Sequence, residues 1–324
     1  MLKQSSIILA CALAAFQATA TQAQTYPTRD ISFIVPWNAG GSNDVAIRAL
    51  DPILREHGIK IVIENVVGAT GSIGMRRIAS SAPDGYTIGM GTSSTLALIA
   101  QGKTNLKNSE FTHIARVSTD PLLLLVPAAA PQKSLDDFIG YMKSKPDKVS
   151  VGTPGNYNIN HIFASMTARA AGVNYVNVPY TGGAKVVGDL LGNHVDAGVL
   201  KPSETLGQIL DGQLRPLGVF ANERLELFPD VPTFKDKGFD VFPYGPVVQM
   251  AWIVAPANLP ADVRTKLLTA FRSAITDPRF KEFAKKNAFL VDDMTGDALT
   301  KEVDNVAAAL GTVAMQVFPK ETKE

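Results

Sequence analysis

The sequence predicts an α/β fold with two lobes joined by two crossing segments. Two series of short β-rich runs alternate with helical patterns, which is typical of mostly parallel sheets. One apolar run follows each series, near residue 122 and near residue 247. A chain that leaves one lobe and later returns to it forms a hinge with a cleft between the lobes. We expect lobe 1 to comprise residues 24–123 and 248–324, and lobe 2 to comprise residues 124–247.

The first series contains short runs rich in Val, Ile and Phe, separated by segments with helical spacing of apolar residues. We expect strands over residues 31–35, 60–63 and 86–91, and helices over 45–57 and 74–81. The run 122–125 is continuously apolar, so we expect a strand that is buried on both faces.

The second series opens on Ser134 followed three residues later by Asp137, which is the pattern of a helix N-terminus. We expect helices over residues 134–145, 160–171, 184–191 and 203–210, and strands over 148–153, 175–178, 195–200, 214–220 and 247–255. Pro260 stands at a helix start, where its missing N–H costs nothing. We expect the remaining C-terminal residues to form helices over 260–275, 277–287 and 295–317.

The N-terminal segment has the anatomy of an export signal. Lys3 precedes an apolar run over residues 6–16 that is too short to span a bilayer, and small residues at Ala18 and Ala20 fit a cleavage site. We expect a signal peptide over residues 1–23 and a periplasmic mature protein. The single cysteine, Cys11, lies in this segment, so the mature chain is expected to have no thiol. A lipoprotein signal ending at Cys11 is the alternative.

The composition argues against several classes of function. The 31 Lys and Arg nearly balance the 30 Asp and Glu, so no basic field indicates nucleic-acid binding. The four His residues show no metal-ligand spacing, and no Gly-x-Ser-x-Gly motif occurs. We expect no enzyme, no catalytic residue, no metal and no cofactor. A hydrolase with Ser42, Ser93 or Ser94 as nucleophile is an alternative that lacks a His–carboxylate pair.

A Gly-Gly loop links the first expected strand to the first expected helix. The loop consists of Trp37, Asn38, Ala39, Gly40, Gly41, Ser42, Asn43 and Asp44. It lacks the third glycine of a dinucleotide fingerprint and the Gly-Lys pair of a P-loop. The N–H groups of a helix N-terminus can bind a carboxylate without a cationic side chain. Alternatively, the glycines only form a turn, and a polar side chain after them caps the helix.

A second Gly-Gly loop holds the matching position in the second series. It consists of Tyr180, Thr181, Gly182, Gly183 and Ala184. Two such loops that face each other across a cleft would suit a small acid held at both ends.

Other candidates lie near the carboxyl ends of expected strands, where α/β proteins bind ligands. They are Thr92, Ser93, Asn158, His161 and Lys201. The plain alternatives are helix capping for the hydroxyls and the amides, and an exposed position for Lys201. The Gly-rich segment 67–74 either lines the cleft or packs under it.

These motifs resemble the periplasmic solute-binding proteins of tripartite tricarboxylate transporters, the Bug or TctC-type family. The resemblance is carried by residues 26–48, 62–92 and 176–198, and most specifically by 83–87 and 178–184. It implies a periplasmic-binding-protein fold that closes on its ligand. It also implies that backbone N–H groups and ordered water at the two Gly-Gly loops grip a ligand carboxylate, and that the partner is a membrane permease with a large and a small subunit.

The sequence departs from the family pattern at Trp37, Asn38, Lys201 and the loop 153–161. Trp37 and Tyr157 would add aromatic surface suited to stacking on a ring, and Lys201 could hold a second polar end. We therefore expect a monomeric binding protein for a small organic carboxylate, with a terephthalate-type aromatic dicarboxylate as the narrower hypothesis. Presentation of the ligand to a periplasmic sensor kinase is an alternative output.

Overall fold

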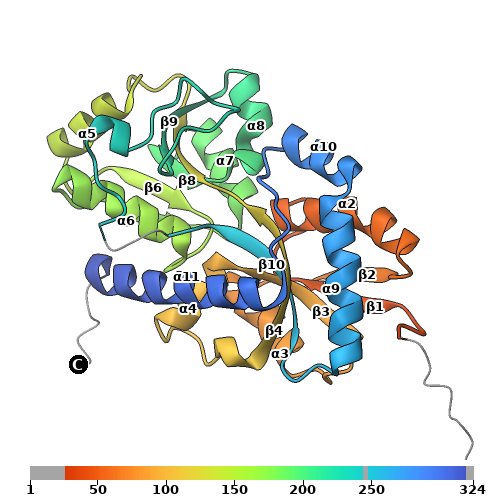
Figure 1. Ribbon diagram of the computed structural model, residues 1–324. Coiled ribbons are helices and arrows are strands. Elements are labelled where there is room, and N and C mark those ends of the chain that lie inside the picture. Colours follow the sequence, from red (N-terminus) through yellow and green to blue (C-terminus); the bar gives the residue numbers. More distant parts are fainter. Residues whose placement is uncertain (1–25, 244–246, 319–324) are drawn as a thin grey trace, which may run out of the picture.

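Two five-stranded sheets with helices packed against them form the two lobes of the protein (Figure 1). The computed structural model describes residues 26–243 and 247–318. The expected signal peptide and Cys11 lie outside the described residues. Figure 1 shows the second sheet and its helices above the first, and the Cα trace passes between them more than once.

The first sheet has the strand order β2-β1-β3-β10-β4. Its strands are β1 (Ile31–Val35), β2 (Ile61–Asn65), β3 (Thr87–Thr92), β4 (Phe111–Thr119) and β10 (Met250–Pro256). β1 pairs in parallel with β2 and β3, whereas β10 runs antiparallel to β3 and β4. Four strands therefore point the same way, and the strand that arrives last along the chain points the other way.

The second sheet repeats this arrangement with the order β7-β6-β8-β5-β9. Its strands are β5 (Leu122–Pro127), β6 (Ser150–Thr153), β7 (Val176–Pro179), β8 (Ala197–Leu200) and β9 (Leu214–Phe220). β6 is parallel to β7 and β8, and β5 is antiparallel to β8 and β9. The predicted α/β architecture with two mostly parallel sheets is confirmed.

The chain changes sheet between β4 and β5, at Asp120 and Pro121, and again between β9 and β10. The apolar run that was expected to close the first lobe at residue 123 belongs entirely to the second sheet. The reason is that β5 is inserted between β8 and β9, so the whole strand is buried on both faces. β4 was not predicted, because Thr, His, Arg and Ser interrupt its apolar residues.

The helices near the first sheet are α2 (Ser42–Glu56), α3 (Ser72–Ala79) and α4 (Ser93–Ala100). Those near the second are α5 (Leu135–Ser144), α6 (Ile159–Ala171), α7 (Gly183–Leu191) and α8 (Pro202–Leu210). The predicted cap of α5 is confirmed, since Ser134 Oγ accepts from the N–H of Asp137, and the Asp137 carboxylate accepts from the N–H of Ser134. α4 was not predicted as a helix.

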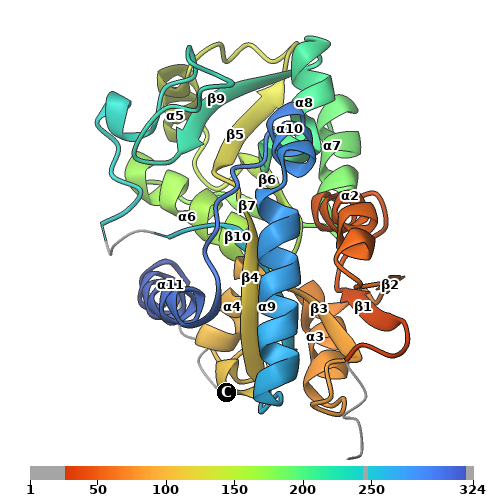
Figure 2. The same cartoon turned by 45° about the vertical axis from the view of Figure 1, so that its right-hand side comes forward.

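Three C-terminal helices complete the fold: α9 (Ala261–Thr276), α10 (Pro278–Lys286) and α11 (Gly296–Val317). Figure 2 shows α9 running along β4 of the first sheet. α11 contacts α4 and β4 of the first lobe and α6 of the second. Because this helix touches both lobes, the lobe boundaries at residues 124 and 247 stay a prediction.

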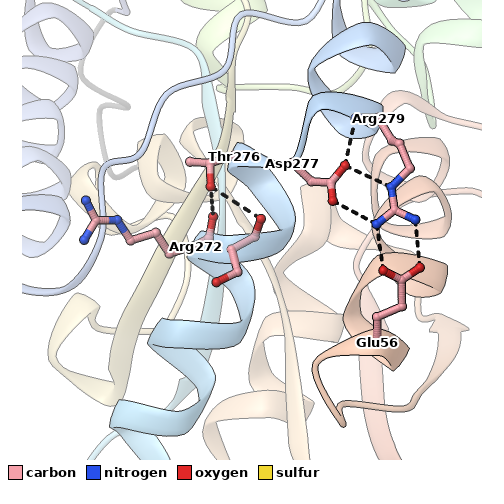
Figure 3. Close-up of polar contacts among 6 residues, drawn as sticks. Glu56, Arg272, Thr276, Asp277 and Arg279 are labelled. Atoms are coloured by element: carbon pink, nitrogen blue, oxygen red, sulfur yellow. Dashed lines mark hydrogen bonds and ion pairs between the residues drawn. The ribbon is translucent and has the colours of Figure 1, made fainter.

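A surface cluster of charges fixes the junction of α9 and α10 to the end of α2 (Figure 3). Arg279 donates two hydrogen bonds of 2.7 and 2.8 Å to Glu56 and further ones to the Asp277 carboxylate. Hydrogen bonds from Arg279 lower the pKa of Asp277 to about 2. This contact holds the start of α10 beside the C-terminal end of α2.

Candidate functional site

A cavity of about 290 Å³ lies between the two Gly-Gly loops. The predicted site residues that line it are Trp37, Asn38, Ala39, Gly40, Gly41, Ser42, Thr92, Gly182, Gly183, Ala184 and Lys201. The two loops come from different sheets, as expected from their positions in the two series. The structure thus brings both loops to one cavity, whose volume is near the lower end of the roughly 300–1,000 Å³ of small-molecule pockets.

The two glycines of the first loop have different structural roles. Gly40 adopts a φ of +77°, a left-handed conformation that favours glycine. Gly41 is the N-cap of α2, and no side chain of the described chain bonds the helix end there. Gly40 does form a turn, as the alternative interpretation of the loop holds, but the capping by Ser42, Asn43 or Asp44 that belongs to the same alternative is not found. Their N–H groups at the first turn have no intrahelical acceptor.

The Asp44 carboxylate lies beneath this loop and holds its shape. It accepts hydrogen bonds of 2.9 Å from Gly40 N–H and from two nitrogens of Arg48, and one of 3.0 Å from Asn65. Asn65 also donates to the carbonyl of Trp37. Burial alone would raise the pKa of Asp44, but these hydrogen bonds outweigh it and lower that pKa. Asp44 does not line the cavity and is a supporting residue of the loop.

The second loop leads into α7 in the same way that the first loop leads into α2. Gly182 is the N-cap of α7, again without a capping side chain among residues 26–243 and 247–318. A Cβ on Gly183 would lie 2.7 Å from the carboxyl carbon and Oε1 of Glu204. Only glycine fits this close approach without moving Glu204. Two helix N-termini, each with N–H groups that need acceptors and a partial positive charge, therefore face one cavity.

Lys201 reaches across the cavity from the second lobe. Its ammonium lies 3.2 Å from Asp120 Oδ2 and donates to Ser42 Oγ at 3.1 Å. Lys201 is 5% exposed and Asp120 is fully buried. The alternative of an exposed surface lysine is therefore wrong. The side chain lines the cavity as expected, but its charge is already paired with Asp120.

The hydroxyl group of Ser93 does not belong to the cavity. Ser93 Oγ donates to the carbonyl of Val248 at 2.7 Å and accepts from the N–H of Met250 at 3.1 Å. It therefore ties the first turn of α4 to the strand that returns from the second lobe. Thr92 lines the cavity and also caps α4, since its Oγ1 accepts from the N–H of Thr95 at 3.4 Å. Ser94 lines the cavity as well.

Asn158 and His161 were expected in the site and lie away from it. Asn158 is fully buried, caps α6 through the N–H of His161, and donates to the carbonyl of Pro154. His161 accepts from the N–H of Tyr157, and both rings pack on Phe318. Burial lowers the pKa of His161 to about 4. These polar groups fold the loop 153–161 rather than line the cavity, and Tyr157 adds no aromatic wall to it.

A second cavity, of about 320 Å³, adjoins the first and shares Trp37, Asn38 and Pro154 with it. Tyr180, Thr181 and residues 67–71 line this second cavity. The Gly-rich segment therefore lines the cleft with its first part, whereas Gly74 packs under the loop, where a Cβ would meet Val66 O at 2.7 Å.

Asn38 lines both cavities. Its Nδ2 donates to the carbonyl of Thr181 at 3.3 Å. Trp37 lines both cavities, its ring lies near Gly71, and its buried Nε1–H has no acceptor among the described residues. The side chain of Tyr180 is held by its hydroxyl, which donates to Asp189 at 2.6 Å.

Several lining residues were missed by the sequence reasoning. They are Val45, Lys185, Ser203, Glu204, Gln249, Asn287 and Phe289, whereas Asn43, Ser94, Pro154 and Asn160 lie in segments that were already candidates. Glu204 stands three residues after Lys201 at the start of α8, so the local pattern indicates its contact with the N–H of Lys201 but not its place in the cavity. No local sequence pattern marks Asn287 and Phe289, because the packing of α9 and α10 against the first lobe brings them to the cavity.

Other kinds of site find little support in the described parts of the chain. No histidine lines the cavity beside Ser42 or Ser94, which leaves the hydrolase alternative without a base. No group of three or more His, Cys, Asp or Glu residues in these parts could hold a metal ion. None of the described helices combines the length and the apolar character needed to span a membrane.

The chain is similar to known proteins over most of its length. A profile of the family described as "Tripartite tricarboxylate transporter family receptor" matches residues 46–317. A UPF0065 protein from the gbd 5' region of Cupriavidus necator is 31% identical over 279 residues, which cover 86% of this chain and 84% of that protein. Protein BugT of Bordetella pertussis is 32% identical over 236 residues, 71% of this chain and 72% of its own.

Solved structures agree with these sequence matches. The periplasmic binding protein BugD superposes with a TM-score of 0.82 and 27% identity, covering 90% of this chain and 98% of that one. MatC from Rhodopseudomonas palustris with bound malate gives a TM-score of 0.83 and 26% identity, covering 89% of this chain and 100% of its own. The two-lobed fold is thus similar to that of periplasmic binding proteins.

Proposed function

Because this chain belongs to the tripartite tricarboxylate transporter receptor family, we propose that it is a periplasmic solute-binding protein for a small organic carboxylate. Receptors of this family bind solutes, and the chain is accordingly a binding protein and not an enzyme. The observation that carries the proposal is the pair of helix N-termini, of α2 and α7, that face one cavity without side-chain caps from the described residues. MatC, a structural relative, contains bound malate, which agrees with a carboxylate ligand.

The cavity geometry supports a simple binding mechanism. The N–H groups at Ser42 and Asn43 would bind one carboxylate oxygen, and those at Gly183 and Ala184 would bind from the other lobe. Closure of the lobes removes water from the cavity, and each hydrogen bond to the charged ligand becomes stronger in the lower dielectric. Asn38 and Lys201 would stabilise the closed form through their bonds to Thr181 and Ser42.

The narrower proposal is an aromatic carboxylate, of which terephthalate is the example. Its remaining support is Trp37, which lines both cavities and would offer an aromatic surface for stacking. Lys201 gives less support to a second carboxylate than expected, because Asp120 already neutralises it. The aromatic ring and the second carboxylate are separate parts of the proposal, and a panel of mono- and dicarboxylates distinguishes them.

The proposed partners follow from the family. The ligand-bound protein would deliver its solute to a membrane permease with a large and a small subunit, and the protein would act as a monomer exported by the signal peptide at residues 1–23. Presentation of the ligand to a sensor kinase would use the same closed form. Uptake assays in a strain lacking the protein separate the two, since a sensor role predicts normal uptake with loss of ligand-induced expression.

A thermal-shift screen with aliphatic and aromatic mono- and dicarboxylates tests the proposal. A ligand that binds only the folded state raises the melting temperature by mass action. At a ligand concentration a hundred times the Kd, the free energy of unfolding increases by about 2.7 kcal/mol. We expect at least one carboxylate to stabilise the protein. If no carboxylate in the panel does so, the proposed function is wrong, and if only aliphatic acids do, the aromatic part is wrong.

A further inference from the structure

The second cavity, of about 320 Å³, adjoins the cavity that is proposed to bind the carboxylate. Its walls come from segments at the ends of strands of both sheets, at residues 36–38 and 67–71 of the first and residues 154–156 and 179–181 of the second. The first turns of α2 and α7, which are proposed to bind the carboxylate, do not line it. The second cavity is therefore available to another part of the ligand.

The walls of the second cavity carry no charged side chain among the described residues, and Trp37 and Val67 supply apolar surface. The first cavity differs in this respect, because Lys185 and Lys201 line it. The first turn of α3, which begins at Ser72, does not line the second cavity either. A carboxylate buried there would lack both a cation and a helix N-terminus, so the cavity favours an uncharged group.

The backbone on one side of the second cavity has an unusual conformation. Ala69 and Thr70 have φ values of +45° and +53°, in the left-handed region that non-glycine residues adopt at an energetic cost. The carbonyl of Thr70 is held by Thr95, whose Oγ1 donates to it at 3.0 Å. From the other lobe, Gly155 comes so close that a Cβ would lie 3.0 Å from Thr70 Oγ1. Strained residues of this kind cluster at binding sites, which is independent support for a ligand in this cavity.

Trp37, Asn38 and Pro154 line both cavities and so mark where the two meet. Asn38 Nδ2 donates to the carbonyl of Thr181, which lines the second cavity, and lies 3.2 Å from the position of a Cβ on Gly182, which lines the first. Asn38 is exposed, and its hydrogen bond is long, at 3.3 Å. A ligand that extends from one cavity to the other can therefore displace this side chain at low cost.

We propose that the second cavity is a subsite for an uncharged, extended tail of the ligand. The carboxylate would lie at the N-termini of α2 and α7, and the tail would pass Asn38 and pack against Trp37 and Val67. This inference rests on the proposed carboxylate-binding function and specifies the ligand as a monocarboxylate with an apolar chain or ring that reaches beyond the first cavity. Burial of each methylene group of such a tail lowers the Kd about fourfold.

Calorimetric titrations with matched acids test the inference. The aliphatic set is butanoate, octanoate and octanedioate, and the aromatic set is benzoate, biphenyl-4-carboxylate and biphenyl-4,4′-dicarboxylate. In the set that binds, we expect the long monoacid to have a Kd at least roughly tenfold lower than both the short monoacid and the long diacid. Equal or tighter binding of the long diacid, or equal affinity for the two monoacids, would overturn the inference and leave the proposed function intact. If no acid of either set binds, the proposed function itself fails.

A single thiol shows whether the tail occupies the second cavity. Cys11 is the only cysteine of the chain, so Val67→Cys in a Cys11→Ser background places one thiol on the cavity wall. With each acid at about ten times its Kd for this variant, roughly a tenth of the protein is free, so we expect the long monoacid to slow alkylation by N-ethylmaleimide about tenfold and the short monoacid to slow it less than about twofold.

The matched control is Val62→Cys in the same background. Val62 is 56% exposed and Val67 is 46% exposed, but Val62 lines neither cavity. Alkylation of this control thiol should be unaffected by either acid. Equal protection of the two thiols by the long monoacid, or equal protection of the Val67→Cys thiol by the long and short monoacids, would overturn the inference.

Discussion

Lys201 of the second lobe and Asp120 of the crossing between the sheets form a buried ion pair, 3.2 Å from Nζ to Oδ2. Ser118 donates to the same oxygen of Asp120, and Ser42 of the first lobe accepts from Lys201. The pair therefore links the crossing segment, the second lobe and the first turn of α2. The ion pair therefore lies at the hinge, and its loss would affect both the stability of the protein and the closure of the lobes.

Removal of Lys201 should destabilise the protein strongly. Lys201→Met leaves the fully buried carboxylate of Asp120 without its cation, which costs about 3–5 kcal/mol in unfolding free energy. The double variant Lys201→Met with Asp120→Asn removes both charges and should recover more than half of that loss, since a buried ion pair contributes little net stability. Urea unfolding measures both. A loss below about 1 kcal/mol for the single variant would contradict the burial of this pair.

A methyl group at Gly183 should weaken ligand binding without unfolding the protein. Gly183→Ala places a Cβ 2.7 Å from the Glu204 carboxylate, and this flexible side chain can move away at little cost in stability. We expect at least a roughly tenfold loss of affinity for the best acid.

The control for Gly183→Ala is Gly188→Ala, in the same helix. A Cβ there meets nothing within 4 Å, so the variant should gain about 0.5–1 kcal/mol of stability and keep its affinity. Equal affinity of the Gly183→Ala variant and the unaltered protein in calorimetry would show that this helix start does not contact the ligand.

Loss of the Asp44 carboxylate should disorganise the first Gly-Gly loop. Asp44→Ala leaves the N–H of Gly40 without its acceptor and removes one of the two acceptors of the Asn65 amide, which costs roughly 1–3 kcal/mol and should lower ligand affinity as well. The control Asp51→Ala breaks another i,i+4 pair on α2, with Arg55, and should cost less than about 1 kcal/mol without changing affinity. Identical effects of the two substitutions would rule out a special role for Asp44.

Two buried histidines should make the protein less stable in mild acid. Burial lowers the pKa of both His113 and His161 from 6.5 to about 4. The unfolded chain therefore binds protons that the folded chain does not, and stability is lost as the pH falls from about 6.5 to about 4. Each residue contributes a slope of up to about 1.4 kcal/mol per pH unit.

The variant His161→Gln checks this slope, because glutamine can still accept the N–H of Tyr157. Urea midpoints between pH 7 and pH 4.5 should fall about half as steeply in the variant as in the unaltered protein. An unchanged slope would mean that the pKa of His161 is the same in the folded and unfolded states, which would contradict its burial as a neutral side chain.

The Gly-Gly loops could be predicted because the features that build them are local. A strand pattern, two glycines and a helical pattern follow one another within a few residues, and these segments fold as the pattern indicates. The cap of α5 by Ser134 is predictable for the same reason. The strand β4 was missed since its polar residues are accommodated by distant partners, as His113 is by the indole N–H of Trp252.

The side chains that were misplaced have partners that no local pattern reveals. Asn158 and Ser93 looked like ligand-binding groups because they follow strands, but Asn158 bonds Pro154 within its own loop, and Ser93 bonds the returning strand. Glu204 was overlooked because its contact with Gly183 joins two helices that are adjacent only in the folded sheet. Such pairings depend on the packing of the lobes, so the cavity wall could be predicted only in part.

The most direct test of carboxylate binding between the two loops is a crystal structure with the acid that gives the largest thermal shift. We predict that its carboxylate oxygens lie about 2.7–3.1 Å from N–H groups at the first turn of α2 or α7, at Ser42, Asn43, Gly183 or Ala184. An acid bound outside the cavity between these loops, or one with no contact to either helix N-terminus, would contradict the account.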